Sequence, residues 1–289
     1  MNLRIQQKFD SKILYVILKP FTCIKGYWVL ICLISNFLPR YLFEVKANIK
    51  IFNRNKILYA NVNYPYMLDI FLKNKNELTI PSLIIKLLPK NTSFADVGAN
   101  CGWYSRIVGA FRSDINIYCF EPSKKAFIEL IKISNFRIFT FPFCCSDEDN
   151  QEFHSKRRFF RQESGAKFMK ISEINTRQFS PTSIKLDTFF SRIKTYPEII
   201  KIDVEGAELN VLRGAPKSLR HANYVFVEVN ENVNCAPFNY EYDDIYKYLI
   251  NLKFKYHYQI FNSHKSVVRL HSFVPGDILF SKHIIQEFE

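Results

Sequence analysis

The sequence predicts an α/β protein with a doubly wound, mostly parallel sheet and helices on both faces. Two observations carry this prediction. From about Tyr59 onward, short apolar segments typical of buried strands alternate with longer segments that have helical spacing. The chain of 289 residues, 48% of them hydrophobic and 23% charged, is also long enough to bury a full core.

The predicted elements follow from hydrophobic periodicity and from boundary residues. The expected strands are 93–97, 116–120, 137–145, a short one near 183–186, 199–202, 224–229 and a closing antiparallel pair, 254–260 and 278–280. The expected helices are 78–88, 103–111, 124–134 with Ser123 as N-cap, 207–219 and 242–252. Residues 61–71 are expected to form a strand and a turn. The chain thus divides into an N-terminal helical extension, residues 1–58, and an α/β domain, residues 59–289.

The extension contains an apolar segment, residues 13–38. Its longest uncharged stretch, residues 26–38, is shorter than the roughly 20 residues that span a bilayer. A packed helix is the first interpretation, and a helix lying on a membrane surface is the second. The 7 cysteines form no C-x-x-C pair, which favours a reducing compartment. We therefore expect a cytoplasmic protein, with peripheral contact at the inner membrane face as the alternative.

The net charge of +13 favours acidic partners such as nucleic acid, an anionic membrane or a phosphorylated substrate. A compositional drift toward lysine would produce the same charge. Basic and aromatic residues alternate in the segment 156–170, which begins with K-R-R-F-F-R. This segment suits a phosphate, a sugar nucleotide or nucleic acid, and a solvated loop is the simpler alternative.

The most informative segment is D-V-G-A-N-C-G, in which an apolar strand runs into a glycine-containing loop before a helix. In an open α/β sheet, ligands bind at the carboxyl ends of the strands. The G-x-x-x-G spacing lacks the third glycine of the dinucleotide fingerprint, and Asp96 would repel a pyrophosphate. These features favour a ligand without phosphates, such as S-adenosylmethionine, whose amino group Asp96 can pair with. The expected cofactor-binding residues of this loop are Asp96, Gly98, Ala99, Asn100 and Gly102.

Two further strand ends are expected at the same edge of the sheet. Glu121 ends the second strand about 25 residues after Asp96, where an acid binds ribose hydroxyls. The alternative is an acid that caps the helix beginning near Ser123. Ser146 and Asp147 end the third strand and are expected to bind the purine edge, with a plain turn as the alternative.

Acidic residues also follow the fourth and fifth strands. Asp203 and Glu205 follow the fourth, and Glu228 and Asn230 end the fifth, so we expect them to converge beside the cofactor. In methyl transfer, Asp203, Glu205 and Glu228 would act as a base or position the nucleophile. Alternatively, Glu205 and Glu208 support the next helix through its dipole. A divalent cation held by Asp203, Glu228 and Asn230 is the third interpretation.

The segments D-V-G-A-N-C-G-W-Y-S, F-E-P-S, C-S-D and I-I-K-I-D-V-E-G-A-E-L-N-V-L-R-G-A closely resemble the FkbM family of methyltransferases. The final V-P-G-D-I-L-F-S-K is also similar to that family's closing strand, so the resemblance covers about residues 60–282. It implies a seven-stranded class I methyltransferase fold of the Rossmann-like type. It also implies S-adenosylmethionine as methyl donor and a sugar or small-molecule hydroxyl as acceptor. By position it places cofactor at Asp96, Gly98, Asn100, Gly102 and Glu121, and the reaction centre at Asp203 and Glu205.

Other classes of protein remain as alternatives. A nucleic-acid methyltransferase fits the net charge, but the sequence has no [DN]-P-P-[YFW] block to hold a flipped base. A cofactor-binding module without catalysis is a further alternative. The expected partner is therefore a small molecule or glycan, with a phosphorylated or nucleotide-linked form suggested by the basic segment 156–170.

Overall fold

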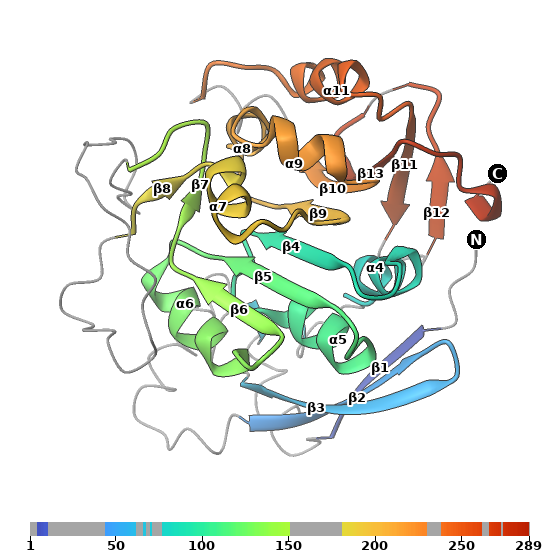
Figure 1. Cartoon of the computed structure of the whole chain (residues 1–289). Coiled ribbons are helices and arrows are strands. Elements are labelled where there is room, and N and C mark those ends of the chain that lie inside the picture. The colour runs from blue at the N-terminus through green and yellow to red at the C-terminus, as the bar shows by residue number, and fades with distance from the viewer. Residues whose placement is uncertain are drawn as a thin grey trace, which may run out of the picture. The chain divides into compact units, whose positions relative to one another are not determined.

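The computed structural model describes residues 5–10, 44–61, 66–67, 70, 77–150, 181–229, 238–261, 266–272 and 274–288 (Figure 1). The chain separates into two compact units, a larger one of residues 84–260 and 267–289 and a smaller one of residues 2–83 and 261–266. Among the described residues, no helix has both the length and the apolar character needed to cross a membrane.

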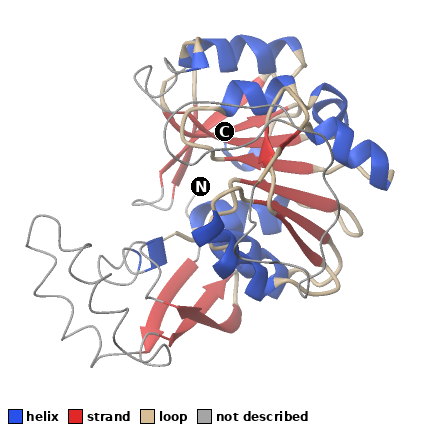
Figure 2. Cartoon of the chain, turned by 90° about the vertical axis from the view of Figure 1, so that its left-hand side faces the viewer, coloured by secondary structure: helices blue, strands red, loops and turns tan. Residues whose placement is uncertain are grey.

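The larger unit is built around a twisted eight-stranded sheet, visible edge-on in Figure 2. Its strands, in spatial order, are β12 (Ser266–Arg269), β11 (Tyr256–Phe261), β13 (Gly276–Ser281), β10 (Tyr224–Val229), β9 (Ile199–Ile202), β4 (Ser93–Val97), β5 (Asn116–Phe120) and β6 (Ile138–Phe141). The five strands from β10 to β6 are parallel, and β13 is antiparallel to both of its neighbours. This confirms the predicted doubly wound fold with its closing antiparallel pair, and β12 extends the expected seven strands to eight.

The strand order reverses between β4 and β9. From β4 the chain proceeds outward through β5 to β6, and it then returns to form β9 on the other side of β4. Every residue of β4 and of β9 is buried. Such central strands are usually continuous apolar runs, so the charged Asp96 and Lys201 within them require partners. The reversal places a ligand crevice at the carboxyl ends of β4 and β9.

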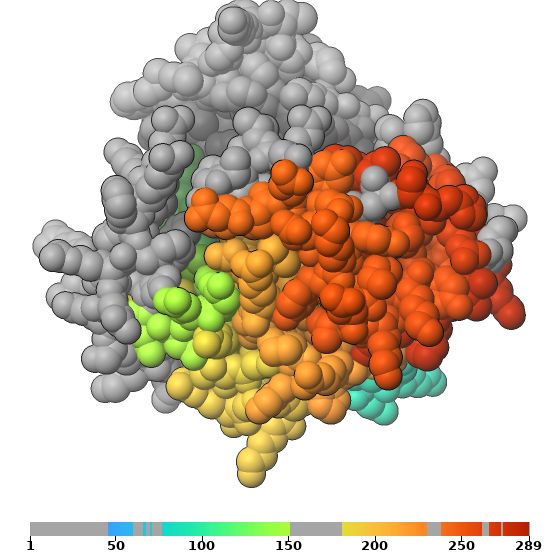
Figure 3. All heavy atoms as spheres, turned by 90° about the horizontal axis from the view of Figure 1, so that it is seen from above, coloured from blue at the N-terminus to red at the C-terminus, as the bar shows by residue number. Residues whose placement is uncertain are grey.

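Helices cover both faces of this sheet. Helices α7 (Leu186–Ile193), α8 (Glu208–Arg213), α9 (Pro216–His221) and α11 (Tyr242–Asn251) share one apolar core with the strand residues that face them. Figure 3 views the protein from above, and most of the coloured residues on the surface there belong to the yellow-to-red C-terminal part of the chain. On the opposite face, α5 (Trp103–Phe111) contacts β4 through a hydrogen bond from Ser105 to Asp96. Helix α6 (Lys124–Leu130) continues as the 3-10 turn Ile131–Ile133.

Two predicted elements are interrupted by proline. The strand predicted over 137–145 is β6 followed by a separate strand β7 (Cys144–Cys145), which pairs with β8 (Ser183–Ile184) in a small sheet of its own. The strand is interrupted at Pro142, because proline has no N–H to donate to a neighbouring strand. The helix predicted over 207–219 is divided into α8 and α9. Pro216 begins α9 at a position where its missing N–H costs nothing.

The smaller unit contains the antiparallel sheet of β1 (Ile5–Asp10), β2 (Glu44–Ile51) and β3 (Arg54–Asn61). The prediction of helices over 1–58 is therefore wrong for these residues. Ala47, Ile49 and Ile51 are buried in alternation with more exposed neighbours, which is the period of a strand. Phe52 and Asn53, both with positive φ, form the two-residue hairpin turn. The apolar segment 13–38 lies outside the described residues, as does most of 61–71.

Candidate active site

The loop between β4 and α5 has an unusual backbone. Gly98, Asn100 and Gly102 have φ values of 76°, 53° and 76°, in the left-handed region where a side chain is unfavourable. A Cβ atom on Gly98 would lie 1.8 Å from the carbonyl oxygen of Asp203. A Cβ atom on Gly102 would lie 2.5 Å from Ile133 Cδ1. The two glycines therefore allow the loop to lie directly against the end of β9 and against the turn after α6.

The loop is held to β5 by two hydrogen bonds. The backbone N–H groups of Gly98 and Ala99 both donate to the carbonyl oxygen of Phe120, each at 3.0 Å. One residue further, Glu121 is 7% exposed and accepts N–H bonds from Asn100 at 2.9 Å and from Ser123 at 2.7 Å. Burial raises the pKa of Glu121. Glu121 thus supports both the loop and the start of α6. A hydrogen bond between Glu121 and the ribose stays a prediction. Each oxygen of the Glu121 carboxylate retains a second lone pair that can accept a ribose hydroxyl.

Asp96 lies below this loop and is 1% exposed. The hydroxyl of Ser105 donates to its Oδ2 at 2.6 Å. Its Oδ1 has no hydrogen-bond partner among the described residues, and the ammonium nitrogen of Lys201 lies 3.8 Å away. Burial raises the pKa of Asp96, and the charge of Lys201 opposes that shift. The pairing of Asp96 with a ligand's amino group stays a prediction, because the cation beside it here is a lysine.

Ser146 and Asp147 follow β7. The Ser146 hydroxyl donates to Asp147 Oδ1 at 3.1 Å, and its backbone N–H donates to the Ile184 carbonyl oxygen at 3.1 Å. A Cβ atom on Gly214 would lie 1.9 Å from the Ser146 carbonyl oxygen, so the turn packs tightly against the end of α8. Burial and the nearby charge of Glu121 raise the pKa of Cys144, which precedes the turn, to about 12. The turn is therefore close to the cofactor side, and its contact with a purine stays a prediction.

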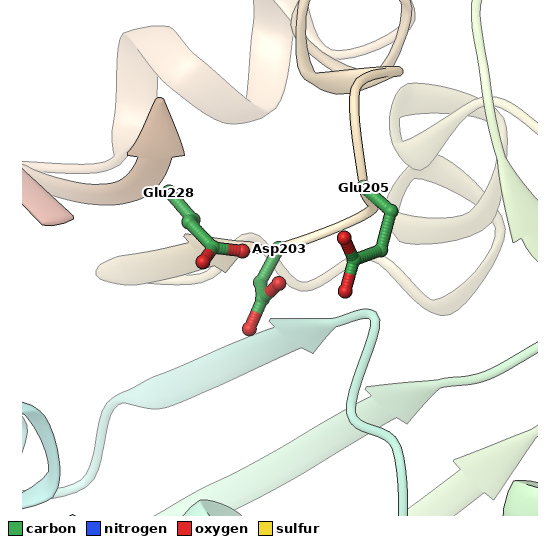
Figure 4. Close-up of side chains that lie close together, drawn as sticks. All are labelled: Asp203, Glu205 and Glu228. Atoms are coloured by element: carbon green, nitrogen blue, oxygen red, sulfur yellow. The ribbon is translucent and has the colours of Figure 1, made fainter. Parts of the chain in front are cut away.

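The three acids predicted at the reaction centre converge, as Figure 4 shows. Asp203, Glu205 and Glu228 each offer an oxygen atom, and these oxygens lie within 4.8 Å of one another. They come from the end of β9, the loop that follows it and the end of β10. Asn230, which was predicted to join them, lies outside the described residues.

The loop after β9 is shaped by Glu208 and Tyr240. Glu205 and Gly206 have φ values of 58° and 109°, so the backbone turns sharply and leaves the Glu205 side chain exposed. Glu208 is fully buried and accepts the N–H groups of Gly206 at 2.9 Å and Val204 at 3.3 Å. The Tyr240 hydroxyl lies 2.6 Å from the Gly206 carbonyl oxygen and 3.0 Å from Glu208 Oε2. Glu208 therefore has a supporting role, as expected, although it supports the loop through hydrogen bonds, whereas the exposed Glu205 accepts none of these N–H groups and can face a ligand.

The acids of the cluster are unequal. A hydrogen bond to Asp203, burial and the charges of Asp203, Asp277 and Glu205 raise the pKa of Glu228 to about 9. Burial would raise the pKa of Asp203 as well, but Lys201, 2.9 Å from its Oδ2, holds that pKa below its ordinary value. The two shifts have opposite directions, so within this pair the proton is held more tightly by Glu228 than by Asp203.

Lys201 was not singled out as a site residue in the sequence. The available signal was a single lysine inside the apolar strand I-I-K-I. A divalent cation bound through Asp203 would have to share that carboxylate with the buried ammonium group of Lys201. We therefore assign no cation to the cluster.

The sequence comparisons agree with this arrangement. Residues 96–258 match the methyltransferase FkbM domain, and this segment contains every predicted site residue from Asp96 to Glu228. The chain belongs to the FkbM methyltransferase family. Its fold is that of the class I methyltransferases, as expected from the sequence. A comparison with curated proteins yields no match.

Among the solved structures that the chain matches are the following two. A putative rRNA-methylase from Clostridium thermocellum has 8% identity and a TM-score of 0.41, over 71% of this chain and 95% of that one. A TehB-like SAM-dependent methyltransferase from Corynebacterium glutamicum has 7% identity and a TM-score of 0.40, over 75% of this chain and 92% of that one. These overlaps are loose, so the family assignment rests on the sequence match.

Proposed function

We propose that this FkbM-family protein transfers a methyl group from S-adenosylmethionine to a hydroxyl oxygen of a glycan or small molecule. The observation that carries the proposal is the close approach of the Gly98 loop to Asp203. It brings the predicted cofactor residues beside a partly exposed carboxylate, whose side chain is 34% exposed. A methyl donor and an acceptor hydroxyl would meet at this place, where the strand order reverses.

The donor groups at the site suit S-adenosylmethionine. Glu121 retains lone pairs for the two ribose hydroxyls, and the backbone of the Gly98–Gly102 loop has no side chains at its two glycines to block a close ligand. Asp96 Oδ1 forms an ion pair with Lys201 at 3.8 Å but accepts no hydrogen bond among the described residues, so it is a buried acceptor that a cationic donor would satisfy. When bound, S-adenosylmethionine supplies a methyl group on a positively charged sulfur.

Asp203 has the central role toward the acceptor. The acceptor hydroxyl loses its proton as its oxygen forms the bond to the methyl carbon, and the carbon–sulfur bond breaks with the electron pair left on sulfur. An ionised Asp203 would accept a hydrogen bond from that hydroxyl, orient its lone pair toward the methyl group and receive the proton. Glu205 and Glu228 would flank the acceptor. The choice of oxygen as the methylated atom is supported by the family resemblance and by this acidic environment.

Calorimetry with S-adenosylmethionine, S-adenosylhomocysteine and NAD(P) tests the cofactor half of the proposal. We expect binding of both sulfur ligands, and weaker binding in Glu121→Ala. Asp203→Asn should retain the cofactor and lose turnover. Binding of NAD(P) without any response to the sulfur ligands would overturn the proposal.

The acceptor half requires a screen. Release of S-adenosylhomocysteine should be stimulated by members of a panel of sugars, sugar nucleotides and glycans. A panel of DNA and RNA serves as the comparison, because the net charge of +13 also fits an acidic polymer. Methylation of the nucleic acids alone would reject a glycan or small-molecule acceptor.

A further inference from the structure

Lys201 is an uncommon residue for the centre of a parallel sheet. It belongs to the fully buried strand β9 and is itself 4% exposed. An ammonium group removed from water in this way requires compensating negative charge. The structure provides that charge from two directions.

The first source of charge is set by strand register. Lys201 on β9 is the direct partner of Asp96 on β4, so the two side chains project from the same face of the sheet. The ammonium nitrogen lies 3.8 Å from Asp96 Oδ1 and 5.2 Å from the centre of the Tyr104 ring. Both Asp96 and Tyr104 belong to the segment that forms the predicted cofactor side of the site.

The second source lies two residues further along β9. The Lys201 ammonium donates to Asp203 Oδ2 at 2.9 Å. The same ammonium group therefore links the acid below the cofactor loop to the acid that faces the acceptor. A side chain that touches both acids determines where the Asp203 carboxylate points.

Glu228 stands on the other side of Asp203. The last residue pair between β9 and β10 is Ile202 with Val227, and Asp203 and Glu228 are the next residues of the two strands. Across β10, Glu228 is paired with a further acid, Asp277 on β13. Two carboxyl groups this close do not both ionise at neutral pH, and they share one proton. The bridging lysine is hydrogen-bonded to Asp203, whereas Glu228 has acids on both sides.

We propose that Lys201 is a positioning residue: it fixes the Asp203 carboxylate toward the acceptor and keeps the proton shared by the two acids on Glu228. This inference rests on the proposed function for its relevance to methyl transfer. Among the described residues, the charged groups that interact with the pair are Lys201, Asp96, Glu121, Glu205 and Asp277. Burial would lower the pKa of Lys201, but Asp203 and Asp96 outweigh burial and raise it, in agreement with a permanent positive charge.

The test is a titration of the carboxyl groups in the cofactor-free protein. NMR of ¹³C-labelled aspartate and glutamate side chains observes the titration of each group. In the unsubstituted chain, one glutamate should titrate near pH 9 and should be absent from Glu228→Gln. Asp203, identified by its loss in Asp203→Asn, should titrate below its ordinary range. In Lys201→Met, Asp203 should gain ~10-fold or more in proton affinity, which is one pKa unit. Compared with Lys201→Met, Lys201→Arg should return the Asp203 titration to below its ordinary range. If Lys201 only filled space, the positive charge of arginine would make no such difference.

A matched control is Lys282→Met. Lys282 is also a partly buried lysine, but it donates to the carbonyl oxygens of Leu219 and Arg220 and not to the acidic cluster. Its replacement should leave the Asp203 titration unchanged. An unchanged Asp203 in folded Lys201→Met would overturn the proposal.

If Lys201→Met does not fold, Glu228→Gln decides. An amide that replaces a protonated carboxyl leaves the Asp203 titration near its position in the unsubstituted chain, whereas loss of a carboxylate would shift it downward by ~10-fold or more. A downward shift, or no glutamate that titrates near pH 9, contradicts the proposal. Since the titration needs no cofactor, a protein that passes it and fails to bind S-adenosylmethionine refutes the proposed function and not the role of Lys201.

Discussion

Replacement of Gly98 by alanine tests the contact on which the site depends. The added Cβ atom would lie 1.8 Å from the Asp203 carbonyl oxygen, and ordinary van der Waals contact begins at 3.4 Å. The two strand ends must therefore separate by about 1.6 Å. Because the obstacle is backbone and not the end of a flexible side chain, no rotamer change relieves the clash.

Two costs add in this variant. A residue other than glycine at a φ of 76° costs about 1–2 kcal/mol. Overpacking against the β9 backbone adds about 1–3 kcal/mol. The total, about 2–5 kcal/mol, corresponds to a decrease in Tm on the order of 10 °C for a domain of this size. Any fraction that folds would have Asp203 displaced, and a misplacement of about 1 Å costs roughly 100-fold in rate.

The assay combines thermal unfolding with calorimetric titration of S-adenosylhomocysteine. Gly109→Ala is the matched control, because the only contact of its Cβ atom shorter than 3.4 Å would be with the terminal Cδ1 of Ile138, at 2.8 Å, and Gly109 is inside helix α5. The control should remain close to the unsubstituted protein in both measurements. A Gly98→Ala protein with unchanged Tm and unchanged affinity would refute the claim that this close approach shapes the site.

Three further predictions follow from the electrostatics and the loop contacts. Between about pH 4.5 and 9 the folded protein retains a proton on Glu228 that the unfolded chain releases, so this group costs stability as pH rises through that window. Glu228→Gln should therefore raise Tm relative to the unsubstituted chain at pH 8, with little difference at pH 4; equal effects at both pH values would contradict the assigned proton. Glu121→Gln should weaken S-adenosylmethionine binding by about 10-fold or more and cost about 1–3 kcal/mol in stability, since the amide oxygen can replace only one of the two carboxylate oxygens that accept the N–H groups of Asn100 and Ser123; unchanged affinity would remove Glu121 from the cofactor site. Tyr240→Phe removes the hydroxyl near Gly206 and Glu208 and should cost about 1–3 kcal/mol in urea unfolding, and an unaltered unfolding curve would show that the loop is held by other contacts.

Much of the larger unit could be predicted from local patterns. Apolar runs that end in or next to a glycine or an acid identified β4, β5, β9 and β10 with the limits that the structure has. Since parallel strands place their carboxyl ends at one edge, the same patterns predicted that Asp203, Glu205 and Glu228 would converge. The wrong predictions fall at places where the sequence carried a local signal that was given less weight than the hydrophobic pattern. Pro142 and Pro216 interrupt segments that are otherwise well patterned, and the alternation of Ala47, Ile49 and Ile51 indicated a strand.

The division of roles within the cluster depends on contacts between distant parts of the chain. Asp96 and Lys201 become partners only through the register of β4 on β9, and Tyr240 reaches Glu208 from beyond β10. Local sequence indicates that an acid ends a strand, because side-chain alternation and strand limits are short-range properties. Whether that acid is ionised, protonated or used as a support depends on charges a few ångströms away, and the packing of the sheet determines which charges those are. The Gly98 loop and the K-I-D-V-E-G-A-E segment thus identify a methyltransferase from sequence, whereas the assignment of the proton to Glu228 required the folded structure.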